Sequence, residues 1–354
     1  MDKATFNILD TLSRELGSTI SIHELTARIR EYHGAAYYAG TYNKIIELQK
    51  QGFITLTKAG RSTIPALDFS SYPLQDHLAE IELRNKLEFL EKRKAFQLLL
   101  EDIEAYAYAD PTIESISLIN PDRNARLNRT ELLILLHDAS SDTLPNNRIN
   151  IHNAMRSLQS NRNIRIDPLS LTNEEFHSLL ISEEINPVKE MLASKITFHN
   201  PSSFWFNIAS IMRGPVRFKL EKEETNPVEI SGTDLNYNLS RFGYTELGIN
   251  IREGRRICIE TIITALMIGD EARRIDAIPI ILAKNKANYE LLLFLSQKYE
   301  SSDRLLGLLK VLQRLKPNND IEHAIKLLEA METKEIKANA KSIEQKMRLY
   351  HAVG

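Results

Sequence analysis

The order of predicted elements in the first 70 residues constrains the fold of this chain more than any other feature of its sequence. Apolar residues at helical spacing predict a first helix from about Lys3 to Leu16, and Gly17 ends it. Ser21 and Glu24 then have the spacing of a capping box, in which each side chain bonds to the backbone amide of the other residue. They predict the start of a second helix, which closes near Gly34.

A third helix and a hairpin follow directly. The helix is predicted from about Tyr38 or Thr41 to Gln51, with Gly52 as its carboxyl cap. Its buried side is expected to carry Tyr42, Ile45 and Leu48. The alternating segment 53–57 predicts a strand, 58–61 a turn and 62–64 the returning strand. Three helices followed by a hairpin with a basic tip is the order of a winged helix-turn-helix, a module that usually binds duplex DNA.

If this module binds DNA, its third helix enters the major groove and its hairpin touches phosphates. The expected contact residues are Thr41, Asn43 and Lys44, beside Glu47, on the helix and Lys58 and Arg61 on the hairpin. Residues 1–70 contain eight Lys and Arg against seven Asp and Glu, a formal charge of +1. Such a balance gives a weak electrostatic attraction to DNA, which favours action as a dimer or with a second basic surface. The alternative is a module that mediates protein contacts or dimerisation.

The composition limits the classes of protein that the chain can belong to. Its net charge of -2 excludes a protein that coats nucleic acid along its whole length, so any DNA contact is local. Cys258 is the single cysteine, which excludes an intrachain disulfide and a thiolate zinc cluster. No signal peptide and no membrane-spanning apolar run is recognisable. We therefore expect a cytoplasmic protein with no membrane partner.

A charged helix is predicted after the first module, from about Leu74 to Tyr108. Near its end an apolar stripe recurs at spacings of three and four: Phe96, Leu99, Ile103 and Tyr106. This stripe needs a partner surface, either the following domain or a second copy of the chain.

From Ile113 the pattern changes to strands alternating with helices. Strands are expected at 115–119, 131–136, 164–171 and 196–198, and helices at 151–158, 173–180 and 187–192. Residues 120–129 are expected to form a polar loop. This order, with the segments IDPLSLTNEEFHSLL and NPVKEMLASKITFHNPSSFW, resembles the small nucleotidyltransferase fold of the antibiotic-modifying and toxin–antitoxin members of the polymerase-beta superfamily. The resemblance covers about residues 95–212.

The resemblance implies a Gly-Ser turn after the first strand, an acidic pair one residue apart on the second strand and a third acid on the next strand. Two divalent metal ions would lie between these acids and a nucleoside triphosphate. The chain departs from this pattern, because Asn120 and Pro121 stand at the turn and Leu133 takes one acidic position. Only Glu131 and Asp167 match acids. Leucine cannot ligate magnesium, so we expect a catalytically degenerate pseudo-enzyme without a cofactor.

The alternative is an active nucleotidyltransferase that uses Mg²⁺ and a nucleoside triphosphate. Its site would combine Glu131, Asp138 or Asp167 in an altered geometry. We interpret His137 and Asp138 instead as the polar end of a strand. The nine histidines show no ligand spacing, so no metal site is expected from them.

Beyond about Leu239 the chain is predicted to be helical. A core helix at 257–268 is followed by one at 271–283 that Pro279 kinks or breaks, then by helices at 289–297 and 304–315 and a final helix to about Tyr350. A basic cluster in this region is a candidate phosphate site: Arg252, Arg255, Arg256, Arg273 and Arg274. The alternative is internal pairing with acids such as Asp270, Glu271 and Asp276.

The expected fold is multi-domain and mainly α, with an α+β centre. Residues 1–72 form the winged helix-turn-helix, 73–108 the connecting helix, 109–212 the nucleotidyltransferase-like domain and 213–354 a helical bundle. Three functions remain open: a DNA-associated regulatory or antitoxin-like binding protein, an active nucleotidyltransferase that modifies RNA or protein, and a scaffold in a nucleoprotein assembly. The first would act with a protein partner or as a homodimer.

Overall fold

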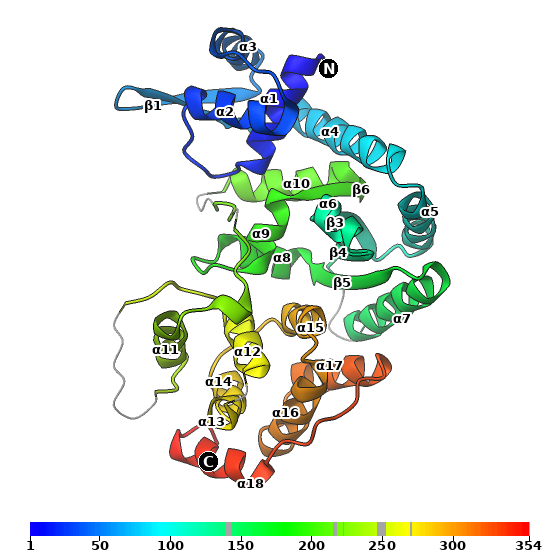
Figure 1. The fold of residues 1–354 in the computed structure, drawn as a ribbon, viewed down its shortest axis with the longest axis vertical. Coiled ribbons are helices and arrows are strands. Elements are labelled where there is room, and N and C mark those ends of the chain that lie inside the picture. The colour runs from blue at the N-terminus through cyan, green and yellow to red at the C-terminus, as the bar shows by residue number, and fades with distance from the viewer. Residues whose placement is uncertain (139–142, 215–217, 222, 246–252, 270, 354) are drawn as a thin grey trace. The chain divides into compact units, whose positions relative to one another are not determined.

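A computed structural model describes residues 1–354 except 139–142, 215–217, 222, 246–252, 270 and 354 (Figure 1). The protein is mainly helical, at 61%, with a small hairpin after three helices and a central mixed four-strand sheet. The chain divides into two compact units. Unit 1 contains residues 1–138, 172–182 and 188–223, and unit 2 contains residues 139–171, 183–187 and 224–354. Unit 1 therefore extends past the domain boundary expected at 212.

Unit 1 begins with the predicted three helices and hairpin. Their bounds are α1 Lys3–Arg14, α2 Ile22–His33, α3 Tyr38–Lys50, β1 Ile54–Ala59 and β2 Ser62–Leu67. Both hydrogen bonds of the capping box are present, from the Ser21 amide to Glu24 Oε2 at 2.7 Å and from the Glu24 amide to Ser21 Oγ at 3.2 Å. Gly17 follows α1 with a φ of +75°, and a Cβ there would lie 2.0 Å from the carbonyl oxygen of Phe218. Glycine is therefore required at this position by both conformation and close approach.

The single connecting helix expected at 74–108 is two helices, α4 Tyr72–Glu91 and α5 Lys94–Ala109. The chain turns at Arg93, whose guanidinium lies 4.5 Å from the ring centroid of Phe89 and pairs with Asp122 at 2.5 Å. The turn brings Phe89 and Phe96 into edge-to-face contact, with ring centroids 5.6 Å apart. The apolar stripe of α5 is covered within the chain, because Phe96, Leu99 and Ile103 are at most 5% exposed.

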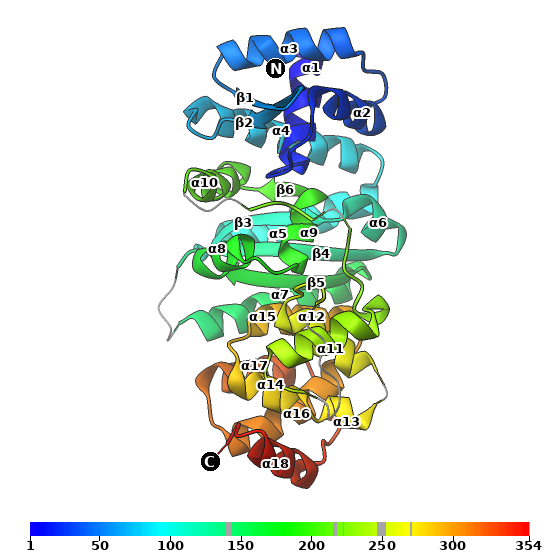
Figure 2. The same ribbon diagram turned by 90° about the vertical axis from the view of Figure 1, so that its left-hand side faces the viewer.

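The central sheet has the strand order β5-β4-β3-β6. Its strands are β3 Ile113–Ile119, β4 Arg129–Leu136, β5 Arg165–Thr172 and β6 Lys195–His199. The helices of this region are α6 Pro121–Arg126, α7 Leu144–Arg162, α8 Asn173–Ile181, α9 Pro187–Ala193 and α10 Pro201–Met212. β3 pairs antiparallel with both β4 and β6, and α10 packs against β3, β6 and α4 (Figure 2). The expected loop at 120–129 contains the short helix α6.

Unit 2 has its own apolar core, which is formed by helices of the carboxyl-terminal part of the chain. These elements are η1 Pro227–Glu229, α11 Gly232–Arg241, α12 Ile259–Ile268, α13 Ala272–Ile275, α14 Ile278–Lys284, α15 Tyr289–Lys298, α16 Ser302–Leu315, α17 Asn319–Ala330 and α18 Ala340–Leu349. Pro279 lies in the first turn of α14, so the predicted break before this proline is confirmed.

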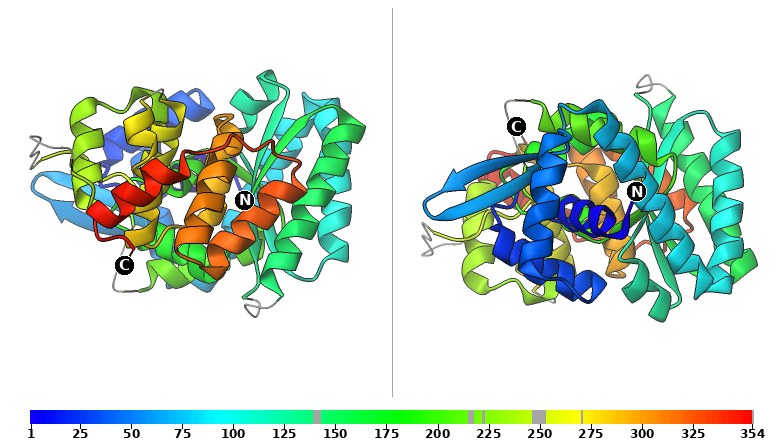
Figure 3. Two further views of the ribbon diagram at one scale, coloured as in Figure 1. Left: turned by 90° about the horizontal axis from the view of Figure 1, so that it is seen from below. Right: turned by 90° about the horizontal axis from the view of Figure 1, so that it is seen from above.

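The predicted final helix is wrong, because α17 and α18 are separated by a non-helical segment. Within that segment the Ile336 amide donates to the carbonyl oxygen of Asp303 at 3.0 Å. A Cβ on Gly307 of α16 would lie 1.9 Å from the carbonyl oxygen of Ile336. The segment therefore crosses α16 at a glycine, and α16 also packs against α17 and α18 (Figure 3, left). No helix among the described residues is long and apolar enough to cross a membrane.

Candidate nucleic-acid interface

The exposed face of α3 differs from the face that the sequence predicts. Thr41, Ile45 and Leu48 form the buried side, at 7%, 0% and 0% exposure. Tyr42 is 40% exposed and Asn43 is exposed as well. The expectation that Tyr42 is buried is therefore wrong, and Thr41, a predicted DNA contact, lies on the packed side of the helix. Positions 41, 45 and 48 repeat at four and three residues, so threonine rather than tyrosine belongs to the packed stripe.

The outer side of α3 carries tyrosines that the sequence analysis missed. Tyr38 and Tyr42 are stacked, with ring centroids 6.1 Å apart and an interplanar angle of 27°. Tyr37, immediately before the helix, is 79% exposed. The signal was present in the spacing of Tyr38 and Tyr42, since residues four apart lie on one face of a helix. Exposed rings of this kind supply apolar contact area together with a hydroxyl group that can donate or accept hydrogen bonds.

Lys44 does not offer a free ammonium group. Its Nζ lies 2.9 Å from Asp2 Oδ2 and 2.9 Å from Glu47 Oε2. These hydrogen bonds, first with Asp2 and then with Glu47, raise the pKa of Lys44. Lys44, a predicted DNA contact, therefore joins the residue before α1 to α3 in this structure.

The hairpin presents two cations at its tip. Ala59 pairs with Ser62, which leaves Gly60 and Arg61 as a two-residue turn. Gly60 has a φ of +61°, the conformation that favours glycine at the first position of a type II′ turn. Lys58 and Arg61 are both exposed, and neither contacts a carboxylate of the described residues. Figure 3 (right) shows the hairpin projecting from the helices of this module.

The near-neutral charge of residues 1–70 is distributed unevenly. Five of the seven acids contact a Lys or Arg of the same segment: Asp2, Asp10, Glu15, Glu31 and Glu47. Glu24 accepts from the Ser21 amide in the capping box. The exposed bases without a carboxylate contact in this fully described segment are Lys3, Arg30, Lys50, Lys58 and Arg61. The formal charge of +1 thus understates the positive charge available at the hairpin tip.

The two acids that match the nucleotidyltransferase pattern are buried in the sheet, and each is paired with an arginine of its own strand. Glu131 is 2% exposed and lies 3.7 Å from Arg129 Nε, and Asp167 is 4% exposed and accepts from Arg165 Nε at 3.1 Å. Leu133, on the same face of β4 as Glu131, is fully buried opposite Ser117. No group of three or more metal-ligating side chains occurs among the described residues.

Beside Leu133, polar groups of the sheet bond to one another. Ser117 Oγ lies 2.8 Å from Thr197 Oγ1, and both residues are at most 1% exposed. Leu133 therefore adjoins polar side chains that are buried and bonded to one another within the sheet.

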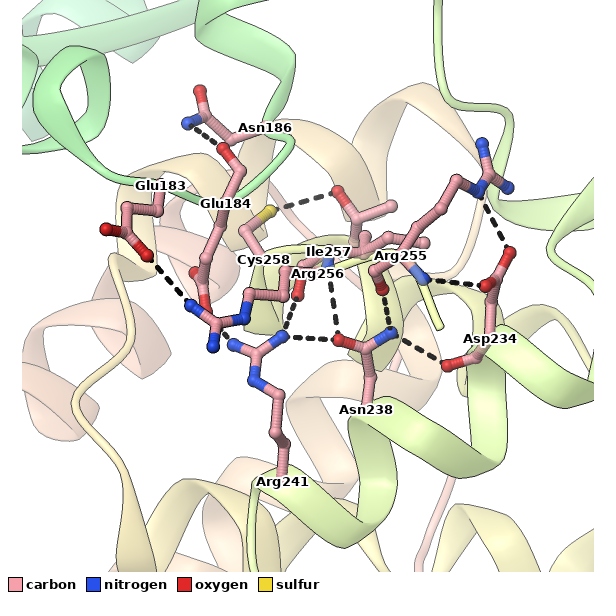
Figure 4. Close-up of polar contacts among 11 residues, drawn as sticks. Glu183, Glu184, Asn186, Asp234, Asn238, Arg241, Arg255, Arg256, Ile257 and Cys258 are labelled. Carbon is pink, nitrogen blue, oxygen red and sulfur yellow. Dashed lines mark hydrogen bonds and ion pairs between the residues drawn. The ribbon is translucent and has the colours of Figure 1, made fainter. Parts of the chain in front are cut away.

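Three of the five arginines in the predicted phosphate cluster have carboxylate partners. Figure 4 shows two of them, Arg255 and Arg256. Arg255 donates twice to Asp234, at 2.9 Å from its backbone amide and 2.9 Å from its Nε. Arg256 donates to Glu183 at 2.8 Å, and Arg274 lies 3.1 Å from Glu271, one of the acids anticipated from the sequence. Arg273 is exposed and has no acid within ion-pair distance in the described chain, whereas Arg252 and Asp270 lie outside the described residues.

Near these arginine pairs, the backbone at Ile185 is hydrogen-bonded to the backbone of residues 256–258. The Ile185 amide donates to the Arg256 carbonyl at 2.8 Å, and the Cys258 amide donates to the Ile185 carbonyl at 3.0 Å. Asn238 reinforces it by donating to the Arg255 carbonyl at 2.8 Å and accepting from the Ile257 amide at 3.1 Å (Figure 4). Arg256 and Cys258 therefore hold the segment 183–187 within unit 2.

Comparisons with known proteins add no family to this description. No family model, no curated protein and no solved structure matches the chain. The function of the chain is therefore inferred from the residues and contacts described above.

Proposed function

We propose that residues 1–70 form a winged helix that binds duplex DNA and that the protein acts as a DNA-associated regulatory or antitoxin-like factor. The observation that carries this proposal is the hairpin tip, where Lys58 and Arg61 are exposed without carboxylate partners in the described chain. The exposed side chains of α3 add a second candidate contact surface. The tip supplies positive charge for phosphates, and the helix supplies side chains for base edges.

The exposed side chains of α3 are of types that can recognise bases in the major groove of DNA. Asn43 is exposed, and an asparagine amide can bond with two atoms of adenine in the major groove. Tyr38 and Tyr42 add rings that can contact sugars or the methyl groups of thymine. Lys58 and Arg61 would contact phosphates and fix the helix in the groove. With few phosphate contacts, we expect modest affinity from one copy and greater affinity from two.

We further propose that the central region is a catalytically degenerate nucleotidyltransferase-like fold that holds a protein partner or a second copy. Supporting this are the burial of Leu133 and the pairing of Glu131 and Asp167 with arginines of their own strands. Two carboxylates already paired with guanidinium groups are poor ligands for the metal ions that nucleotidyl transfer requires.

The test is titration of fluorescent duplex DNA with the full-length protein at several salt concentrations. The double variant Lys58→Ala, Arg61→Ala should weaken binding and reduce the slope of log affinity against log salt by about 2, because each substitution leaves one phosphate without its cation. The matched control is Lys326→Ala, Arg348→Ala, which removes two exposed cations from unit 2. Absence of binding at low salt, or an equal weakening in the control, would contradict the proposal.

A further inference from the structure

A cavity of about 500 Å³ lies in unit 1 between α8 and α10, where the chain leaves β4. Its polar lining includes Asp138, Asn173, Glu174, His177 and Asn207. Serine hydroxyls and apolar side chains complete the lining. The volume is within the range of small-molecule sites, which combine apolar walls with a few polar groups.

A buried carboxylate lies behind the cavity wall. Glu114 is 7% exposed, and its Oε2 accepts from Asn173 Nδ2 at 2.6 Å while its Oε1 accepts from Asn207 Nδ2 at 3.0 Å. The two asparagines are also joined, because Asn207 Nδ2 lies 3.0 Å from Asn173 Oδ1. Both amides that line the cavity are thus fixed by one acid at the beginning of β3.

This carboxylate has little compensating positive charge. No Lys or Arg of the described residues forms an ion pair with Glu114, and the nearby ionisable base is His137, whose Nδ1 lies 3.5 Å from Glu114 Oε2. That histidine carries charge only when protonated. Neutral amide donors stabilise a buried carboxylate, but they do not cancel the negative potential that it projects into an adjoining cavity.

The cavity itself adds two further acids and an unsatisfied nitrogen. Asp138 and Glu174 both line it, and neither forms an ion pair within the described chain. His177 Nε2 is buried and has no hydrogen-bond partner among the described residues. A buried polar atom without a partner costs free energy, so a ligand group that bonds with this nitrogen would be stabilised there.

We propose that this cavity binds a small organic cation that carries a guanidinium or ammonium group. The negative potential comes from Asp138, Glu174 and Glu114, and the first two are placed to pair with the cation directly. Such groups donate several N–H bonds and accept none, which matches the acceptor oxygens of carboxylates. Phe176 and Ile181 provide apolar surface for the carbon chain of the ligand.

The site is separate from the position where the family resemblance implies a nucleotide. Glu114 lies at the beginning of β3, whereas Asn120 and Pro121 follow the other end of that strand. A nucleoside triphosphate is anionic and would be repelled by the three carboxylates. None of the residues that line the cavity belongs to residues 1–70, so cation binding there can be measured separately from DNA binding.

The experiment compares n-butylguanidinium with n-butylurea, a neutral molecule of nearly the same shape, by calorimetric titration of the full-length protein. We expect the cation to bind at least about tenfold more tightly, because only the cation pairs with the carboxylates. n-Butylammonium is a second probe and establishes which cationic group the site prefers. Equal binding of n-butylguanidinium and n-butylurea, or absence of binding by both cations, would overturn the proposal.

Two variants test whether the cation binds in this cavity. Asp138→Asn and Glu174→Gln should each raise the dissociation constant of n-butylguanidinium about fivefold or more, since each removes one charge that faces the ligand. Glu101→Gln is the matched control, because Glu101 is exposed on α5 and does not line the cavity. Unchanged binding in both cavity variants, or an equal weakening in Glu101→Gln, would place the cation elsewhere and contradict the proposal.

Discussion

The ammonium nitrogen of Lys44 lies 2.9 Å from the carboxylate of Asp2. The same carboxylate caps α1 by accepting from the Thr5 amide at 2.8 Å. These bonds, first with the Thr5 amide and then with Lys44, lower the pKa of Asp2 to about 2. One acid therefore both begins α1 and fastens α3 to it, so the orientation of the proposed recognition helix depends on the second residue of the chain.

This arrangement predicts that the lysines of the first module differ in their effect on DNA binding. Lys44→Ala should leave the salt dependence of binding nearly unchanged, because its ammonium group is already neutralised by Asp2 and Glu47. Lys58→Ala should reduce the slope by about 1. The measurement is fluorescence anisotropy with one duplex over a series of salt concentrations. A larger effect of Lys44→Ala than of Lys58→Ala on the slope would show that Lys44 leaves its acids and binds phosphate.

Asp10 should make the stability of the protein dependent on pH in the acidic range. Burial opposes ionisation of this carboxyl, but bonds from His33, Arg14 and Asn85 outweigh burial and lower its pKa from 3.8 to about 2. Its stabilising effect is thus present above about pH 4 and is lost as the pH falls through 2. The shift corresponds to about 2 kcal/mol.

Urea unfolding between pH 5 and pH 2 tests this expectation. The variant Asp10→Asn should be less stable than the natural protein at pH 5, and the difference between the two should shrink toward pH 2. A difference that stays constant over this range would show that the ionisation of Asp10 does not contribute.

The buried pair Lys195–Glu82 should contribute strongly to the stability of unit 1. The Lys195 side chain is 6% exposed and its Nζ lies 4.2 Å and 4.6 Å from the ring centroids of Phe204 and Trp205. Burial lowers the pKa of Lys195, although Glu82 acts in the opposite direction. Lys195→Met should lower the free energy of unfolding by about 3–5 kcal/mol, because it leaves the Glu82 charge buried without its partner.

A double variant separates the charge from packing. Glu82→Gln removes the negative charge while keeping an oxygen that can accept from the Thr197 amide, which donates to Glu82 at 2.8 Å. Adding Glu82→Gln to Lys195→Met should therefore restore part of the lost stability in chemical denaturation. If the two effects simply add, the pair is not coupled as described.

Two helical glycines should respond oppositely to the same substitution. Gly307→Ala places a Cβ 1.9 Å from the carbonyl oxygen of Ile336, so we expect a loss of about 1–3 kcal/mol. Gly40→Ala on α3 meets nothing within 4 Å and should stabilise the protein by about 1 kcal/mol through helix propensity. Thermal and urea unfolding of both variants provide the measurement. Equal effects of the two substitutions would mean that the crossing segment moves away from α16.

The sequence predicted most of the elements because their signals are local. The capping box of Ser21 and Glu24, the glycine after α1 and the proline at the start of α14 each act within a few residues. The breaks within 74–108 and after α17 have no such signal. Arg93 has neither glycine nor proline beside it, and α5 separates from α4 where Phe96 packs against Phe89. That packing depends on the folded chain and was not visible in the sequence.

The candidate sites were predicted less well than the elements. The bounds of α3 were predicted well, but the side of the helix that packs inward was not. Tyr42 was expected on the buried side and Thr41 on the exposed side, and both residue types are common on either side of a helix. The cavity was missed because Glu114, Asp138, Asn173 and Asn207 come from four separate places in the chain. Only pairing of β3 with β4 and packing of α8 and α10 place them together.

The alternation of the chain between units 1 and 2 has a consequence for its synthesis on the ribosome. Every residue of unit 1 has been translated once residue 223 is added, but residues 139–171 and 183–187 belong to unit 2 and have been translated earlier. Ile185 must wait for Arg256 and Cys258 before its backbone groups are paired. A nascent chain that pauses between these points therefore carries all residues of unit 1, whereas the segment 183–187 within it still lacks its backbone partners.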